Sequence, residues 1–366
     1  MEIQKLSLNM RKIIFFVSFL LICINILYCF SGVMNFPIQS MDLYSNWLLK
    51  AKAFYYSTSF PYEFFQSWDN MSSHPQYPIL LPLTFSAIYK ALGGIHEQNI
   101  LLIYPLIYSV ILFLCFKTVR RLFSFSNSLF LSYIYSMFPV LLSQAGRGHA
   151  GNADIILALI LWTIVSLIYK ANITTLKVIL ISLLIMLASQ IKSEGVFFVI
   201  LFFFLPLSML KKITLMTIST IPFLVWNVFV YSHHFASDIY VKFPGLSLFF
   251  QRLIIVIWEI SQELLKLNNW YIFWPLFFLL ITFKPKLSQE VNKIFIPSLL
   301  IMLLLYCCVY VFGFFSFSTI NTSNYVSSSF DRILLQLSPI IFLWFSEMLL
   351  FGKPKTQKSQ TIAKSN

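Results

Sequence analysis

The sequence predicts an all-α polytopic membrane protein with about 10 to 12 transmembrane helices. Hydrophobic residues make up 58% of its 366 residues and charged residues only 11%, whereas about a quarter of an average soluble domain is charged. Apolar runs of nearly membrane-spanning length recur from one end of the chain to the other. This combination excludes a water-soluble fold.

The first apolar run, 13–33, is too long for a signal peptide and lacks a small-residue cleavage site, so we expect a retained signal anchor. Two later stretches leave open whether they cross the membrane. Residues 79–93 overlap the proline-broken run YPILLPL, and residues 246–267 carry the mixed charges of an interfacial helix. The remaining predicted crossings are 99–116, 122–144, 153–169, 175–190, 195–210, 213–231, 268–283, 294–313 and 333–350.

Lys and Arg residues accumulate on the cytoplasmic loops of membrane proteins and therefore predict orientation. If neither open stretch crosses and the N-terminus is cytoplasmic, 17 of the 26 Lys and Arg residues lie inside, against 15 if both cross. We therefore expect about ten crossings, both termini in the cytoplasm and a short basic cytoplasmic tail over 351–366. The net charge of +13 reflects these loops and the lipid headgroups, and it indicates no nucleic-acid partner.

The same orientation places ten of the 13 acidic residues on the outer face, although acidic residues contribute little to orientation. A polar, ligand-binding outer face explains this excess. We expect five polar segments to converge there above the bundle and to form a cavity that lipids can reach. They are 34–78, 145–152, 191–194, 232–245 and 314–332.

The polar stretch that follows the anchor, QSMDLYSNWLLKAK, contains a candidate catalytic carboxylate. Ser40 can cap the helix that Tyr44, Trp47 and Leu48 indicate, which places Asp42 in the first turn. The helix dipole favours a negative charge at that position, and a carboxylate there can accept a proton as a general base. Asp42 could equally serve only to cap its own helix.

Five short motifs occur along the chain in the order DLYSNWLLKAKAF, HPQYPILLPL, GHAGNADIILAL, KSEGVFF and SSSFDRILLQLSP. In this order, and on one predicted face, they resemble bacterial members of the GT-C superfamily of integral membrane glycosyltransferases. The branch that they resemble includes protein O-mannosyltransferases and the aminoarabinose transferase of lipid A. The resemblance extends over about residues 10–350 and implies that residues 1–350 form a single GT-C-type helical bundle, with interfacial helices in the first external loop.

The resemblance implies a transferase in the cell (inner) membrane that moves a sugar from a polyprenyl-phosphate donor to a glycan, lipid or protein acceptor outside the cytoplasm. It also implies a catalytic Asp in the first external loop, here Asp42 within 34–78, and a second acid in the next one, here Asp154. Asp154 could also cap the helix that follows it. Many mannosyltransferases carry an adjacent acidic pair where this chain has Asp42 alone, and several relatives carry a soluble domain after the last crossing. These departures leave the sugar and the acceptor open.

A departing lipid phosphate needs its negative charge neutralised. Arg147 and His149 lie in the Gly-rich turn GRGHAGN, which suits phosphate contacts but also an ordinary solvated loop. Lys192 could bind the phosphate or simply pair with Glu194, and Arg332 could bind it or anchor the last crossing at the membrane surface. The predicted phosphate ligands are Arg147, His149, Lys192 and Arg332, and the predicted supporting residues are Glu194, Asp331, Lys50, His74 and Tyr77.

The sequence shows no cluster of His, Cys and acidic residues at metal-ligand spacing, so we expect no resident metal or cofactor, and a divalent ion on the donor phosphate stays open. The five Cys residues lie in or beside apolar segments, which favours packing over disulfides.

Two other classes of function also stay open. A transporter or flippase would show charges at helix midpoints and internal repeats, and a noncatalytic scaffold would make Asp42 and Asp154 dispensable. The charges lie at the outer ends of the predicted crossings and no repeat is visible, which favours the glycosyltransferase.

Overall fold

The computed structural model describes residues 8–237, 239–283, 285–315 and 321–349. This part of the chain is helical almost throughout, as the sequence predicts. Its strands form a small antiparallel sheet in which β1 (Ile239–Val241) pairs with β2 (Gly313–Phe315), with Tyr240 opposite Phe314. The sheet joins two connections that follow long helices, so it fixes the ends of those helices to each other.

The first half of the chain forms helices α1 (Leu8–Asn35), α2 (Leu49–Tyr56), α3 (Tyr62–Gln66), α4 (Leu80–Ala91), α5 (Glu97–Leu101), α6 (Ile103–Val119), α7 (Phe125–Ser136), α8 (Pro139–Gly146) and α9 (Asp154–Ile168). The second half forms α10 (Thr175–Ile191), α11 (Ile200–Phe204), α12 (Met209–Ser232), α13 (Leu246–Leu265), α14 (Leu267–Trp270), α15 (Phe273–Thr282), α16 (Ile296–Phe312) and α17 (Thr322–Met348). Wider π-helical turns occupy Asp42–Leu48 and Val291–Phe295, and tighter 3₁₀ turns occupy Trp68–Ser73 and Ser193–Val199.

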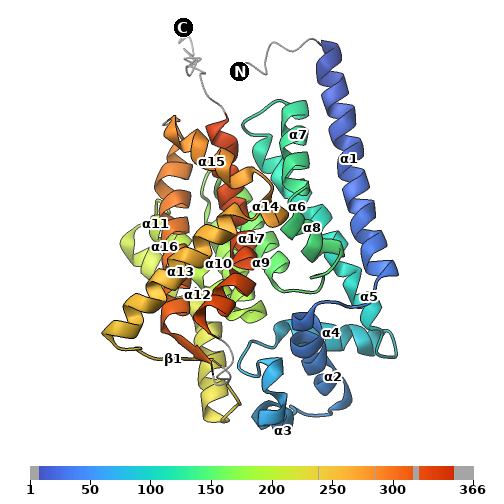
Figure 1. The fold of residues 1–366 in the computed structure, drawn as a ribbon, viewed down its shortest axis with the longest axis vertical. Coiled ribbons are helices and arrows are strands. Elements are labelled where there is room, and N and C mark those ends of the chain that lie inside the picture. The colour runs from blue at the N-terminus through green and yellow to red at the C-terminus, as the bar shows by residue number, and fades with distance from the viewer. Residues whose placement is uncertain (1–7, 238, 284, 316–320, 350–366) are drawn as a thin grey trace, which may run out of the picture.

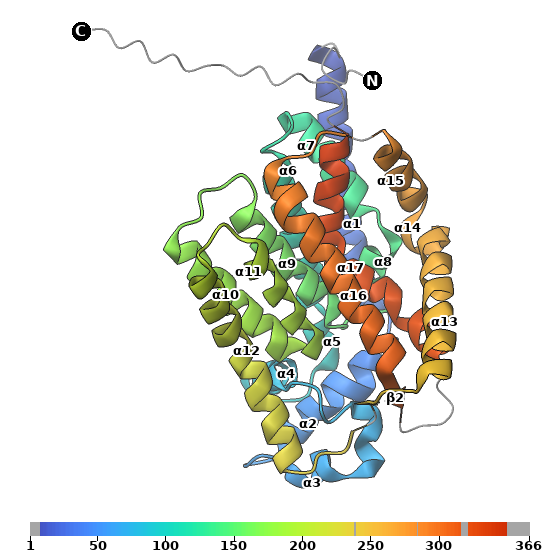
Figure 2. The ribbon, with the colours of Figure 1, turned by 90° about the vertical axis from the view of Figure 1, so that its left-hand side faces the viewer.

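The long helices stand side by side, and the short helices α2, α3 and α4 gather at one end of the bundle (Figure 1). We call this end, which carries residues 36–78, the loop end. The beginning of α1 and the end of α17 lie at the opposite end of the bundle (Figures 1 and 2). The loop end therefore collects the first long polar segment of the chain.

Helix α17 forms the centre of the bundle and packs against α9, α13 and α16 (Figure 2). Every residue of 333–343 is buried. A helix that is apolar around its whole circumference must be covered on all sides, and this stretch meets that condition apart from a few polar side chains. Those polar side chains, among them Gln336, consequently lie inside the protein.

Helix α1 lies at the edge of the bundle and touches α7 and α8 (Figure 1). A Cβ atom on Gly32 would lie 2.0 Å from the Gly146 carbonyl oxygen, and one on Gly146 would lie 2.2 Å from the Cys29 Cα atom. Small residues allow two helix backbones to approach this closely in a membrane. The two glycines therefore fix α1 against the end of α8.

Five described stretches are long and apolar enough to cross a membrane, and α7 with α8 makes a sixth if that bent pair is one span. These helices indicate a membrane-embedded protein. The predicted number of about ten crossings is not confirmed, because α9 and α10 have only 15 and 17 residues, against the roughly 20 that a span requires. The five stretches are Asn9–Asn35, Glu97–Val119, Met209–Ser232, Val291–Phe312 and Thr322–Met348.

Three predicted crossings are interrupted. Residues 122–144 divide into α7 and α8, which meet at 72° where Pro139 begins the second helix without a backbone N–H to donate. Residues 195–210 form a 3₁₀ turn and the short α11, which ends at an extended Leu205 because Pro206 disfavours a helical residue before it. Residues 268–283 divide at Tyr271 between α14 and α15.

The two stretches that the sequence leaves open are both helical. Residues 79–93 contain α4, whose 12 residues are too few to span a bilayer as one helix. Residues 246–267 contain α13, which has 20 residues but is not among the span candidates of the described chain. The interfacial position of α13 stays a prediction, and the predicted tail 351–366 lies outside the described residues.

Candidate functional site

The predicted polar segments contact one another at the loop end. Ser40 Oγ donates to Asn152 Oδ1 at 2.5 Å, which joins the first segment to the second. Gln66 Nε2 donates to the His233 carbonyl at 2.8 Å, which joins the first to the fourth, and the β1–β2 pair joins the fourth to the fifth. The chain therefore brings segments that are far apart in sequence to one place.

Asp42 stands at the start of a helix that Ser40 caps, as predicted. The Leu43 backbone N–H donates to Ser40 Oγ at 3.1 Å, although the turn that follows is π-helical rather than α-helical. The Leu43 side chain also packs against Gly151, where a Cβ atom would lie 2.3 Å from Leu43 Cδ2. The cap and this close contact hold the first turn, and with it Asp42, against the 145–152 loop.

Arg332 bridges the two predicted catalytic acids. Its Nη1 atom lies 2.5 Å from Asp42 Oδ2, and its Nε atom lies 3.3 Å from Asp154 Oδ2. Arg332 projects from α17, Asp154 begins α9, and Asp42 belongs to the segment after α1. A planar guanidinium can hold two carboxylates at once in this way, which an ammonium group cannot do with the same geometry.

Asp154 is also held by Lys192 and Gln336. Lys192 Nζ donates to Asp154 Oδ1 at 2.9 Å, and Gln336 Nε2 donates to the same oxygen at 2.5 Å. Asp154 is 1% exposed and Lys192 is 5% exposed. A buried carboxylate is tolerated only when charges and hydrogen bonds compensate it, and Asp154 has both.

Lys192 stays charged in this position. It lies in the turn between α10 and the following 3₁₀ segment, where burial by itself lowers the pKa of Lys192. The neighbouring carboxylates of Asp154 and Glu194 raise that pKa by more, so the pKa of Lys192 lies above its ordinary value. Its ammonium group therefore holds Asp154 and Glu194 across the whole physiological pH range.

Two predicted supporting acids lie beside these residues. Glu194 Oε1 lies 3.3 Å from Lys192 Nζ. Asp331 Oδ1 accepts the backbone N–H of Arg332 at 2.8 Å. We use the term Arg332 network for the ion-paired residues Asp42, Asp154, Lys192, Glu194 and Arg332.

The exposure of the Arg332 network rises toward Asp42. The Asp154 and Lys192 side chains are 1% and 6% exposed, whereas those of Arg332 and Asp42 are 21% and 34% exposed. A ligand can therefore reach the Asp42–Arg332 pair, while the Asp154–Lys192 pair supports it from inside. The network therefore has a solvent-accessible part at Asp42 and Arg332 and a buried part at Asp154 and Lys192.

Three further predicted residues form a second cluster on the first polar segment. Lys50 Nζ donates to the His74 carbonyl at 3.2 Å and lies 5.1 Å from the centre of the Trp47 ring. The His74 and Tyr77 rings stack with their centres 5.0 Å apart. Lys50 and Trp47 are fully or almost fully buried, so this cluster stabilises the 34–78 segment.

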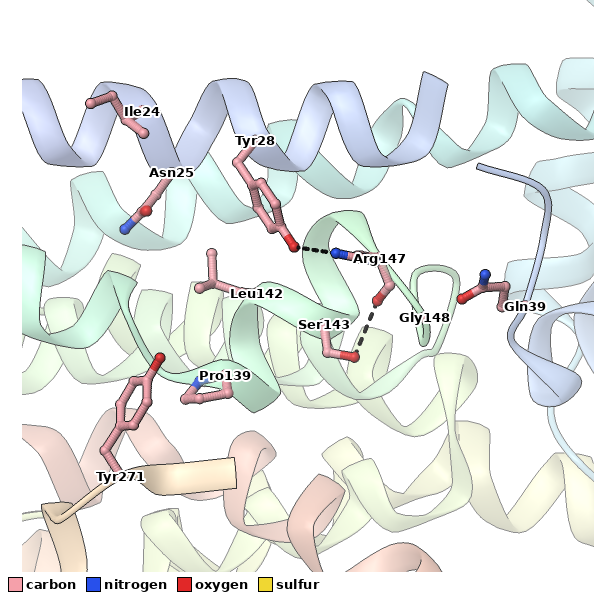
Figure 3. Close-up of a pocket in the computed structure, with 10 residues that line it drawn as sticks. All are labelled: Ile24, Asn25, Tyr28, Gln39, Pro139, Leu142, Ser143, Arg147, Gly148 and Tyr271. Carbon is pink, nitrogen blue, oxygen red and sulfur yellow. Dashed lines mark hydrogen bonds between the residues drawn. The ribbon is translucent and has the colours of Figure 1, made fainter. Parts of the chain in front are cut away.

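Arg147 and His149 lie outside the Arg332 network within the described chain. Arg147 Nη1 donates to the Tyr28 hydroxyl on α1 at 3.1 Å (Figure 3). The guanidinium also lies 5.0 Å from the centre of the Phe36 ring. Both Arg147 and His149 are exposed. The end of α8 turns Arg147 toward α1, so nearness in sequence to Asp154 does not make it a neighbour in this network.

Two residues that were not predicted from the sequence, Gln336 and Asn152, complete the site. Gln336 lies four residues after Arg332 on α17, which places both on one helix face, and that spacing is visible in the sequence. Asn152 receives the Ser40 hydroxyl bond that connects two segments, and no sequence pattern announces that pairing. In the described parts of the chain, no group of three His, Cys, Asp or Glu residues has a geometry that could hold a metal ion.

Comparisons with known proteins found no protein-family model and no curated protein that matches this sequence. The family resemblance therefore stays a prediction from the five motifs. The geometry of the Arg332 network is independent of that resemblance.

Proposed function

We propose that this protein is a membrane glycosyltransferase that moves a sugar from a polyprenyl-phosphate donor to an acceptor hydroxyl. The observation that carries the proposal is the direct contact of Asp42 and Asp154 with Arg332. The sequence nominates Asp42 for catalysis by its helix position and by the family resemblance, Asp154 by the resemblance, and Arg332 for the donor phosphate by its charge. This reaction requires a base for the acceptor hydroxyl and a cation for the leaving phosphate within one site.

In the proposed reaction, the acceptor oxygen attacks the anomeric carbon on the face opposite the phosphate. The bond from that carbon to the phosphate oxygen breaks, the phosphate leaves with the bonding electron pair, and the hydroxyl proton passes to Asp42. A single carboxylate suffices for inversion in one step through an oxocarbenium-like state. Asp42 is assigned to this role because it is the more exposed of the two acids, at 34% against 1% for Asp154.

Arg332 is assigned to the leaving phosphate. Its Nη1 atom contacts Asp42, so a phosphate oxygen that binds there displaces the carboxylate. Donor binding then releases Asp42 at the moment when a base is needed. The contact from Nε to Asp154 keeps the guanidinium in place during this exchange, which makes Asp154 and Lys192 positioning residues.

The proposal places the loop end on the extracytoplasmic face of the cell (inner) membrane, with both termini in the cytoplasm. Its support is the distribution of Lys and Arg along the sequence. The donor reaches the site from the lipid, and the acceptor is a glycan, a lipid or a protein on that face.

To test this, membranes that contain the protein are incubated with a panel of labelled polyprenyl-phosphate sugars and with native envelope acceptors. We expect product from the wild type, and a loss of about 10² to 10⁴ in rate for Asp42→Asn. The matched control is Asp69→Asn, which changes an exposed acid of the same polar segment and keeps the wild-type rate. Equal product from Asp42→Asn and wild type overturns the assignment of the base.

Transport or flipping of a lipid-linked substrate is the second candidate. The observation in its favour is the buried Asp154–Lys192 pair, because ionisable residues inside a helical bundle are typical of coupled transport. Liposomes that contain the purified protein and a lipid-linked sugar distinguish sugar transfer from transport. Movement of the lipid across the bilayer without any transferred product supports the transporter.

A further inference from the structure

A cavity of about 570 Å³ lies between α1 and α8, apart from the Arg332 network. Its volume is in the range of small-molecule sites. Figure 3 shows α1 on one side of this cavity, with Tyr28 directed toward Arg147, and α8 on the other. The lining residues are Ile24, Asn25, Tyr28, Gln39, Pro139, Leu142, Ser143, Arg147, Gly148 and Tyr271.

One end of the cavity is polar and positively charged. Arg147 is exposed and bonds to the Tyr28 hydroxyl, and among the described residues it forms no ion pair with a carboxylate. The Gln39 side chain lies at the same end, and Gly148 also lines the cavity there. Gln39 has no hydrogen-bond partner within the described chain, so an amide and a guanidinium without a carboxylate partner lie together at this end of the cavity.

The other end of the cavity is apolar. Ile24, Pro139 and Leu142 line it together with the Tyr271 ring (Figure 3). The Asn25 amide in this part donates to Ser136 Oγ at 2.9 Å and is thereby satisfied. Ile24 is 48% exposed, so this end opens on the exposed apolar surface of α1.

We propose that this cavity binds a phospholipid of the surrounding bilayer, with an anionic phosphate headgroup at Arg147 and an acyl chain along Ile24 and Leu142. Charge complementarity selects the headgroup, because a guanidinium without a carboxylate partner attracts a phosphate. A fully hydrophilic occupant such as a free anion does not match the apolar end, because it offers no acyl chain to contact Ile24 and Leu142. This site is separate from the proposed transfer reaction, and its test does not require activity.

The test uses purified protein in detergent with dioleoylphosphatidic acid or dioleoylphosphatidylcholine, and native mass spectrometry counts the bound lipid. We expect the wild type to bind the phosphatidic acid at least about tenfold more tightly than the phosphatidylcholine. Arg147→Gln keeps a donor for Tyr28 but removes the charge, and it abolishes this preference. Leu142→Trp fills the apolar end and weakens the binding of phosphatidic acid about tenfold.

Lys242→Gln is the matched control, since it removes an exposed positive charge from the segment before α13 and outside the cavity. It keeps the wild-type preference. Preference that survives Arg147→Gln overturns the proposal, as does undiminished binding of phosphatidic acid by a folded Leu142→Trp variant. Displacement of the lipid by inorganic phosphate alone at equal concentration also overturns it. If Leu142→Trp fails to fold, Arg147→Gln on the exposed end decides the test.

Discussion

Replacing Asp154 with Asn tests the buried half of the Arg332 network. Asp154 Oδ1 accepts from Lys192 and Gln336, and its Oδ2 atom faces Arg332 Nε at 3.3 Å. Asn can still accept with one oxygen, but its amide group then points donors at the arginine. It also leaves the 5% exposed Lys192 without its main counter-charge. Loss of one partner from a buried ion pair costs about 3–5 kcal/mol.

The same change at Asp42 has a much smaller effect on stability. The Asp42 and Arg332 side chains are 34% and 21% exposed, and ion pairs in contact with solvent contribute about 0–1 kcal/mol. The structure therefore predicts that Asp154→Asn destabilises the protein strongly and Asp42→Asn barely does. This contrast separates a residue that positions from a residue that reacts.

The assay is unfolding by SDS titration in mixed micelles, followed by circular dichroism. Asp69→Asn serves as a surface control and stays within about 0.5 kcal/mol of the wild type. The double variant Asp154→Asn with Lys192→Met removes both buried charges, so its loss of stability is smaller than the sum of the single losses. An Asp154→Asn variant as stable as wild type, with additive losses in the double variant, would refute the reasoning.

Three further predictions follow from the same geometry. Lys192→Met is less stable than the wild type at all pH values below the ordinary lysine pKa of about 10.4. The pKa of Lys192 is raised in the folded state, so the charged lysine stabilises the fold below its unfolded-state pKa, and this stabilisation is lost only as the pH rises through the folded-state pKa. Unfolding titrations at several pH values measure the difference. Gly146→Ala pushes α8 away from the Cys29 backbone and lowers the free energy of unfolding by about 1–3 kcal/mol. The control Gly94→Ala places its methyl group only against the His96 ring and keeps the wild-type stability in the same SDS titration. Arg332→Lys keeps the positive charge but loses the bridge between Asp42 and Asp154, so sugar transfer falls about tenfold or more with unchanged donor specificity. A wild-type transfer rate in Arg332→Lys would contradict the bridging role.

Apolar length predicts the long helices of this fold but not their interruptions. Helix α1 contains the predicted crossing 13–33, and α17 contains residues 333–348 of the predicted crossing 333–350. Pro139 and Pro206 break two others, and hydropathy alone cannot show this because the residues around both prolines are apolar. The backbone restriction that proline imposes on the residue before it was a visible signal for the second break.

The sequence pattern did not predict the first residue of α17, for a different reason. The polar run before residue 333 indicates a loop, yet α17 begins at Thr322, where the Asn321 side chain accepts the Asn324 backbone N–H at 2.8 Å. Asn before a helix is a known capping signal, and hydrophobic periodicity does not register it. The earlier start puts Asp331 and Arg332 on a helix instead of in a loop.

The members of the site are easier to predict than their contacts. Charges are rare in this chain, so Asp42, Asp154, Lys192 and Arg332 stand out in the sequence. Their pairing depends on tertiary packing, since 290 positions separate Asp42 from Arg332. Arg147 shows the limit of sequence proximity, because the direction in which α8 ends turns this side chain to α1.

Sugar transfer per folded molecule, in wild type and in Asp42→Asn, is the most direct test of the central claim. The membranes receive the same donor and acceptor, and the amount of folded protein is measured in each by the SDS titration. We expect Asp42→Asn to fold like the wild type and to transfer sugar about 10² to 10⁴ times more slowly. Transfer at the wild-type rate by the folded variant would contradict it and remove Asp42 from the reaction.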